Sequence, residues 1–194
     1  MSYKYFKSIT TPKLALAAAE DAFARFHKVI SACQAAGLDF DDIFGSKNQS
    51  EMLGKIFENS AAQIYSIHTG LTVINPTSDN EPDLFFKEKN LPLEIKVTKT
   101  ETWTGGTFSK RPANYWLISW DKESKKDCFI ALAHLEKEDW KAGGASYYGT
   151  SYSKKKLYQA VQEGKATVLV GSLAPGGRKT RYKNPLSLLR EQII

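Results

Sequence analysis

The sequence predicts an α/β fold in which a central mixed β-sheet is flanked by helices in a single domain. Apolar residues recur at helical spacing over the first third of the chain, and short apolar or aromatic runs replace them after Gly70. A helical segment, a further strand and a last helix follow these runs. The 194 residues suit one domain with its own core. This order of elements is typical of a sheet covered by helices.

Two long helices are predicted in an N-terminal helical part, residues 1–66. Thr11 followed by Pro12 is the pattern of an N-cap with proline at the first helical position, and Gly37 ends this helix. Ser46 and Gln49 have the spacing of a capping box at the start of the second helix. The apolar residues expected to face the core are Leu16, Ala19, Phe23, Phe26 and Ile30 in the first helix, and Met52, Leu53, Ile56, Phe57 and Ile64 in the second.

A sheet region, residues 71–135, and a C-terminal part, residues 142–194, are expected to follow. In these parts, short runs rich in β-branched and aromatic residues are separated by polar turn residues. Ser153 is expected to cap a helix over 154–163, and Pro185 to begin a last helix over 186–193. The expected strands are Leu71–Ile74, Asp83–Phe86, Leu91–Val97, Tyr115–Trp120, Cys128–Leu132 and Ala166–Gly171.

The composition excludes several classes of function. No run of eighteen apolar residues exists, and the N-terminus lacks the apolar stretch of a signal peptide, so a cytoplasmic protein without a membrane span is expected. The cysteines and histidines are too scattered for a zinc site or for Cys–His nucleophilic catalysis. The chemistry is therefore expected to depend on carboxylates, lysines and hydroxyls.

The net charge of +6 is unevenly distributed along the chain. Residues 1–60 hold seven Lys or Arg and seven Asp or Glu, whereas residues 142–194 hold nine basic residues and two acidic ones. A basic C-terminal part joined to a neutral N-terminal part is typical of a protein that binds a polyanion.

Asp83, Glu94 and Lys96 form the most informative constellation. Alternate side chains of a strand share a face, so Glu94 and Lys96 point one way while Ile95 and Val97 point to the core. A tight hairpin centred on Lys89-Asn90 would set Asp83 opposite Lys96 and on the same face.

This cluster suits the hydrolysis of a phosphodiester. Two neighbouring carboxylates repel each other unless a hard cation lies between them, and Mg²⁺ prefers a few protein oxygens together with water and phosphate. A bound Mg²⁺ would polarise the phosphate and lower the pKa of a bound water. Lys96 could orient or deprotonate that water, or neutralise charge on the phosphate, and the sequence leaves these roles open.

Pro82-Asp83 before an apolar strand, and Glu94-Ile95-Lys96 on the next strand, resemble the motif of the PD-(D/E)XK nuclease superfamily, which includes many restriction endonucleases. The resemblance covers roughly residues 50–135 as a pattern of elements. It implies that Asp83 and Glu94 hold Mg²⁺, that Lys96 assists the attacking water, and that the carbonyl of Ile95 is a further metal ligand. It also implies an acidic residue on the preceding helix, for which Glu58 fits best and Glu51 is the reserve.

Basic and hydroxyl side chains in three segments are the expected contacts with DNA. The loop that leaves the catalytic strand carries glycines, hydroxyls and cations that suit a phosphate backbone. Lysines of a triplet would position the phosphates, and arginines near the C-terminus could read guanine bases. The candidates are Thr98, Lys99, Ser109, Lys110 and Arg111; Lys154, Lys155 and Lys156; and Arg178, Lys179, Arg181 and Lys183.

The expected function is that of a Mg²⁺-dependent, sequence-specific endonuclease on double-stranded DNA, similar to a type II restriction endonuclease. A palindromic site would require two copies of so small a chain, so a homodimer is expected. The alternatives are a structure-selective nuclease of the same superfamily, such as a junction resolvase or repair nuclease, and a nucleic-acid-binding module without catalysis.

Overall fold

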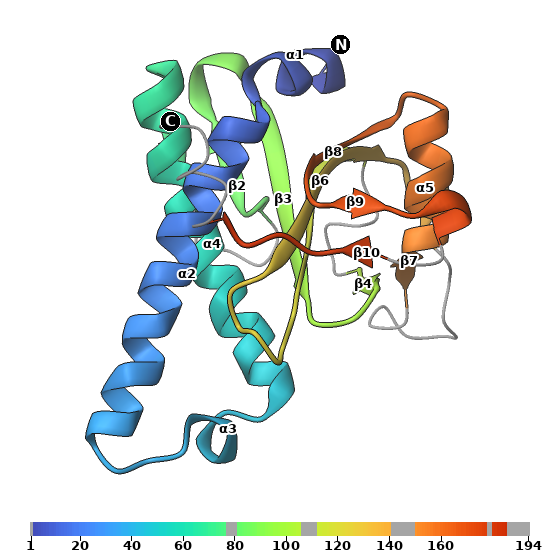
Figure 1. The fold of residues 1–194 in the computed structure, drawn as a ribbon. Helices are drawn as coiled ribbons and strands as arrows, with labels where there is room; N and C mark the ends of the chain where they lie inside the picture. Colours follow the sequence, from blue (N-terminus) through green and yellow to red (C-terminus); the bar gives the residue numbers. More distant parts are fainter. Residues whose placement is uncertain (1, 77–80, 106–111, 141–149, 178–179, 186–194) are drawn as a thin grey trace, which may run out of the picture.

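The fold has a six-stranded mixed sheet at its centre with helices on both faces (Figure 1). The structure is a computed structural model that describes residues 2–76, 81–105, 112–140, 150–177 and 180–185. The strand order is β1-β2-β3-β5-β6-β8, in which β3 and β5 are parallel and every other pair is antiparallel. The predicted α/β class with a mixed, helix-flanked sheet is therefore confirmed. The strands of this sheet are β1 (Val73–Ile74), β2 (Leu84–Phe86), β3 (Leu91–Thr98), β5 (Ala113–Trp120), β6 (Cys128–Leu135) and β8 (Ala166–Val170).

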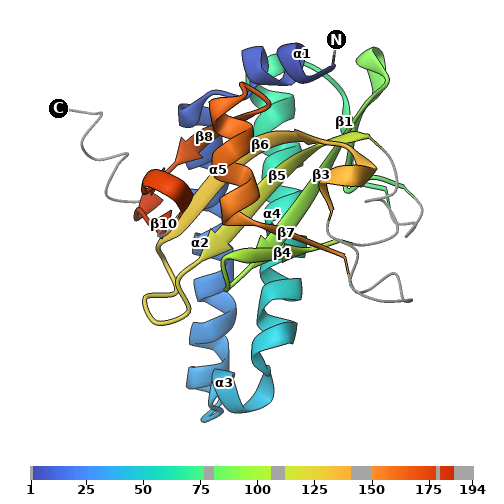
Figure 2. The same cartoon turned by 90° about the vertical axis from the view of Figure 1, so that its right-hand side faces the viewer.

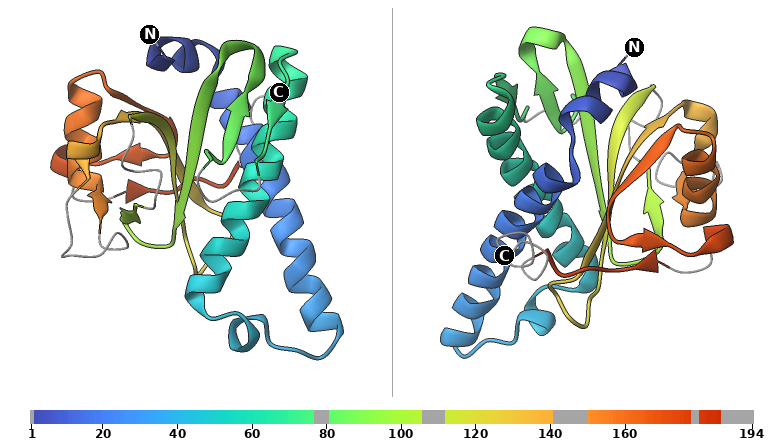
Figure 3. Two further views of the ribbon diagram at one scale, coloured as in Figure 1. Left: turned by 180° about the vertical axis from the view of Figure 1, so that it is seen from behind. Right: turned by 45° about the horizontal axis from the view of Figure 1, so that its top comes forward.

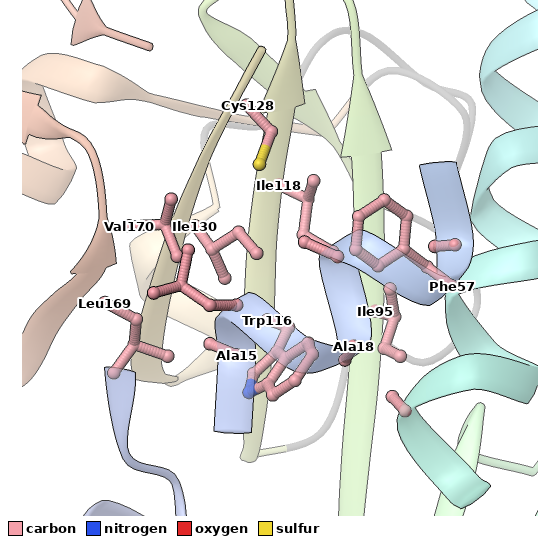
Figure 4. Close-up of a cluster of buried hydrophobic side chains, with 14 of the residues drawn as sticks. Ala15, Ala18, Phe57, Ile95, Trp116, Ile118, Cys128, Ile130, Leu169 and Val170 are labelled. Atoms are coloured by element: carbon pink, nitrogen blue, oxygen red, sulfur yellow. The ribbon is translucent and has the colours of Figure 1, made fainter. Parts of the chain in front are cut away.

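One face of the sheet is covered by the N-terminal helices, α1 (Ser2–Ile9), α2 (Pro12–Ala35) and α4 (Ser46–Thr69). Every second residue of the central strands points into this layer, among them Ile95 of β3 and Trp116 and Ile118 of β5 (Figure 4). These side chains meet Phe57 of α4 and small residues of α2 such as Ala15. The core predicted for α2 and α4 is confirmed, because its members are buried or packed against this cluster.

The helix boundaries follow local chemistry, with one exception. Thr11 caps α2 by accepting a hydrogen bond from the amide of Leu14 at 3.1 Å, and Pro12 is the first helical residue, as predicted. The capping box of the second helix was a wrong prediction. Its cap is Gly45, which provides no side-chain bond, and the Gln49 amide instead donates to the Asp41 carboxylate and the Phe44 carbonyl. The short helix α3 (Phe40–Ile43) connects α2 to α4.

The opposite face of the sheet is covered by α5 (Lys154–Gln162) and by a small antiparallel pair (Figure 2). This pair joins β4 (Thr102–Thr104) to β7 (Ser151–Ser153), two segments that were not among the expected strands. A second unexpected pair joins β9 (Ser172–Leu173) to β10 (Thr180–Arg181). The short 3₁₀ helices are η1 (Lys87–Lys89), η3 (Lys137–Asp139) and η5 (Pro175–Gly177).

The four tryptophans are core residues. Trp103 and Trp140 belong to the α5 side of the sheet, whereas Trp116 and Trp120 belong to the α2 side, and all four are at most 5% exposed. In both views of Figure 3, the two layers lie on either side of one continuous sheet. Among the helices that the structure describes, none combines the length and the apolar character that a membrane crossing needs. The predicted last helix, residues 186–193, lies outside the described residues.

Candidate active site

Asp83 and Glu94 are brought together where β2 begins and β3 is in mid-course. The register pairs Leu84 with Leu93, so the next position outward places Asp83 opposite Glu94. The amide of Asp83 donates to Glu94 Oε2 at 3.3 Å, and the amide of Ile95 donates to Asp83 Oδ2 at 2.7 Å. Each carboxylate is thus held by the backbone of the other strand.

The expected pairing of Asp83 with Lys96 was wrong by two residues. The chain does not reverse in a tight turn at Lys89-Asn90, because η1 lengthens the connection and Asn90 ends it with a left-handed φ of 52°. A shift of two residues leaves every side chain on its predicted face. Asp83, Glu94 and Lys96 therefore share one face of the sheet, while Ile95 points into the opposite core.

The backbone at Ile95 also faces the β2 edge. The amide and carbonyl of one strand residue point to the same side, and the Ile95 amide is directed at Asp83. The residue that the register would set opposite Ile95 is Pro82, which has no N–H to donate to the Ile95 carbonyl. Because Pro82 has no N–H, the Ile95 carbonyl lacks the hydrogen bond that a β-ladder would give it at this position. The resemblance to the nuclease superfamily implies that this carbonyl is a metal ligand.

Glu94 and Lys96 form a close ion pair in a sheltered position. Lys96 Nζ lies 2.5 Å from Glu94 Oε1. The side chain of Lys96 is 21% exposed, and that of Glu94 is 5% exposed. The parallel pairing with β5 places Tyr115 beside Glu94 on the α5 side of the sheet, where Tyr115 is fully buried. The rest of that face is covered by apolar residues, so the charged pair lies at the border of the core.

Glu58 joins this cluster from α4. The helix approaches β3 closely at Gly54, where an added Cβ would lie 3.8 Å from Val97 Cγ2. Glu58 follows one helical turn later, and it is only 5% exposed. The Lys55 ammonium lies 2.8 Å from Glu58 Oε2. By contrast, the reserve candidate Glu51 is exposed and is paired with an exposed lysine.

The three carboxylates act on each other electrostatically. Burial, with a further contribution from the charge of Asp83, raises the pKa of Glu58 to about 7. Burial and Asp83 also raise the pKa of Glu94, although Lys96 opposes this change. Burial alone would lower the pKa of Lys96, but the charges of Glu94, Asp83 and Glu58 raise it overall. Negative charge is therefore concentrated at this point and is balanced by nearby ammonium groups.

The oxygen atoms of this cluster suit Mg²⁺, an ion that needs only a few protein ligands. Among the described residues, no group of three or more His, Cys, Asp or Glu side chains is arranged as a metal cage. Asp83 and Glu94 nevertheless offer two carboxylates beside the Ile95 carbonyl. Magnesium commonly binds one or two carboxylates and keeps several waters or phosphate oxygens. Such an ion would relieve the repulsion from Asp83, which adds to burial in raising the pKa of Glu94.

The candidate DNA contacts lie in different environments. Thr98 ends β3 on the face of Glu94 and Lys96, and Lys99 follows it. Within the lysine triplet, the Lys154 ammonium pairs with Glu101, and the Lys156 ammonium donates to the Asp139 carbonyl. The side chains of Lys155, Arg181 and Lys183 are exposed. Ser109, Lys110, Arg111, Arg178 and Lys179 lie outside the described residues.

Two further residues of the cluster were not singled out from the sequence. Lys55 lies one helical turn before Glu58, so helical spacing could have identified it. Tyr115 is buried beside Glu94, and burial, together with the charges of Glu94 and Asp83, raises the pKa of its hydroxyl. No local pattern indicates the parallel pairing that brings Tyr115 there.

A surface cavity of about 500 Å³ borders this site at Pro82. Its other lining residues come from β1, β2 and the segments that follow or precede them: Ile74, Asn75, Pro76, Glu81 and Phe85.

Comparison with known proteins adds no family to these observations. No protein-family model matches the chain, and no curated protein matches its sequence.

Proposed function

We propose that this protein is a Mg²⁺-dependent endodeoxyribonuclease of the PD-(D/E)XK type, with the restriction endonuclease-like core that this motif implies. The observation that supports the proposal most is the convergence of Asp83, Glu94 and Lys96 on one face of two adjoining strands, with Asp83 and Glu94 linked through backbone amides. A pair of partly sheltered carboxylates beside a lysine is suited to a cation and a phosphate diester.

In this proposal, each residue has a separate task. Asp83 and Glu94 hold the ion, with the Ile95 carbonyl as a third oxygen and Glu58 on the helix side. The bound ion would polarise the scissile phosphate and acidify a water. Lys96 has three N–H groups, of which one serves Glu94, so the others can hold the attacking water or a phosphate oxygen. Tyr115 is buried beside Glu94 on the neighbouring strand and shields that side of the carboxylate from solvent.

The proposed substrate is double-stranded DNA. The net charge of +6 favours a polyanion, and Lys155, Arg181 and Lys183 are exposed cations among the predicted DNA contacts. Cutting both strands at a palindromic site would take two copies, so we propose a homodimer on DNA. Sedimentation of the protein with and without a short duplex tests this oligomeric state.

The decisive experiment is incubation of plasmid DNA with the pure protein and Mg²⁺, with EDTA as the parallel sample. Discrete fragments indicate sequence-specific cutting, and cutting confined to branched DNA indicates a structure-selective nuclease. Retarded but intact DNA indicates binding without catalysis. Asp83→Asn, Glu94→Gln and Lys96→Met should each lower cleavage by about 100-fold or more, because several kcal/mol of transition-state stabilisation is lost.

The matched control is Glu123→Gln, which removes an exposed carboxylate from the β5–β6 connection. It should cleave as the wild type does. Equal cleavage by Asp83→Asn and the wild type would refute the assignment of the site.

A further inference from the structure

Lys55 and Glu58 form an ion pair of unusual asymmetry. The Glu58 side chain is 6% exposed, whereas the Lys55 side chain that neutralises it is 71% exposed. Another lysine–glutamate pair on the same helix, Lys47 with Glu51, is open to solvent on both sides, at 87% and 64% exposed, and its atoms are 3.5 Å apart. The carboxylate of the first pair is therefore sheltered inside the charged cluster, and its ammonium approaches from the solvent side.

The ammonium of Lys55 lies where a cation is needed. It is 2.8 Å from Glu58 Oε2, and it also interacts electrostatically with Asp83 and Glu94. A lysine ammonium is a compact point charge on a flexible four-carbon chain, so the Lys55 side chain can move its ammonium away from Glu58 without a change in the backbone. A divalent ion bound by Glu58 would take the same carboxylate oxygens and would repel the ammonium.

We propose that Lys55 is a positioning residue that neutralises the ionised Glu58 carboxylate in the metal-free protein and competes with the divalent ion for it. Lys96, which lies on β3 beside Glu94, neutralises the Glu94 carboxylate through a similar ion pair. The two lysines keep the carboxylates in place without a metal, and binding of the ion displaces the more exposed one. This inference rests on the proposed function, because it assumes that the cluster binds a divalent cation.

The test measures metal affinity without DNA. Mn²⁺ is titrated into the protein, and the remaining free ion is followed by its electron paramagnetic resonance signal. Lys55→Met, which keeps the length of the side chain and removes its charge, should bind Mn²⁺ about tenfold more tightly than the wild type. Lys47→Met is the matched control on the same helix, and its affinity should equal that of the wild type.

A double-mutant cycle separates competition at Glu58 from a general change of charge. On a Glu58→Gln background, Lys55→Met should raise the Mn²⁺ affinity much less than tenfold, since the shared carboxylate is gone and only the longer-range repulsion between the ammonium and the ion remains. Equal affinities of the wild type and Lys55→Met would overturn the role of Lys55 while leaving the nuclease proposal in place. Absence of Mn²⁺ binding by all variants would overturn both.

Discussion

The Asp83 carboxylate accepts a hydrogen bond from the backbone amide of Ile95 at 2.7 Å, immediately before β2 begins. This bond replaces the ladder contact that the backbone at Pro82 would otherwise make, and it fixes Asp83 next to Glu94 before any ion binds. The Pro82-Asp83 pair therefore determines the local geometry, because the proline ends the backbone pairing between β2 and β3 and the Asp83 carboxylate accepts from the Ile95 amide instead.

Replacing Asp83 separates cleavage from DNA binding. Asp83→Ala should abolish cleavage, whereas its DNA affinity in EDTA should equal or exceed that of the wild type, since a negative charge near the phosphate is removed. Gel retardation in EDTA and plasmid cleavage in Mg²⁺ give the two measurements. Loss of DNA binding together with cleavage would instead indicate that Asp83 maintains the fold of the hairpin.

The stability of the metal-free protein should fall as the pH rises from about 4.5 to 7. Burial raises the pKa of Glu58 to about 7, so the folded state keeps a proton that the unfolded chain has already lost in this interval. The raised pKa of Glu94 acts in the same direction. For Glu58 alone, the loss is on the order of 2 kcal/mol once screening by solvent is allowed for.

Urea denaturation in EDTA at pH 5 and pH 8 measures this loss. Glu58→Gln should be more stable than the wild type at pH 8 and should show a smaller difference between the two pH values. Glu51→Gln, on the exposed side of the same helix, is the control and should behave as the wild type. A wild-type protein that gains stability between pH 5 and pH 8 in EDTA would contradict the buried position of Glu58.

The lysine triplet should divide into structural and DNA-contacting members. Lys155→Ala should weaken DNA binding and reduce the salt dependence of log K by about one, without changing stability. Lys154→Met should instead lower the free energy of unfolding by about 1 kcal/mol, because it removes the ion pair between Lys154, at the start of α5, and the partly exposed Glu101 carboxylate. Salt-dependent binding and urea denaturation of both variants distinguish the two effects, and equal behaviour would contradict this division.

The arrangement of the site on two strands was predictable because it depends on local periodicity. Helical spacing identified α2 and α4, and alternation along β3 put Glu94 and Lys96 on one face. The predicted hairpin register was wrong by two residues, and a shift by an even number leaves each side chain on its predicted face of the sheet. Helical spacing could likewise have identified Lys55 from its distance to Glu58.

The remaining features depend on contacts between distant segments. Tyr115 lies beside Glu94 because β3 and β5 are parallel, and β4 pairs with β7 across a long stretch of chain. The capping box failed for a similar reason, since Gln49 found partners in Asp41 and the Phe44 carbonyl. Tertiary hydrogen bonds of this kind override a local capping signal, and no spacing in the sequence announces them.

The contact between α4 and β3 should determine the position of Glu58. Gly54 of α4 lies next to Val97 of β3, and an added Cβ would meet Val97 at 3.8 Å, which is an ordinary van der Waals distance. Gly54→Ala should therefore be accommodated, and it should stabilise the protein by about 0.5–1 kcal/mol, because glycine is unfavourable inside a helix.

A larger side chain at the same position should have the opposite effect. Gly54→Leu would push α4 away from β3 and move Glu58, one helical turn further on, out of the cluster. Thermal unfolding should show a lower midpoint, and plasmid cleavage should fall towards the level of Glu58→Gln. Full cleavage by Gly54→Leu together with a lowered midpoint would contradict a role for Glu58 in the reaction, since cleavage would then not depend on the position of this carboxylate.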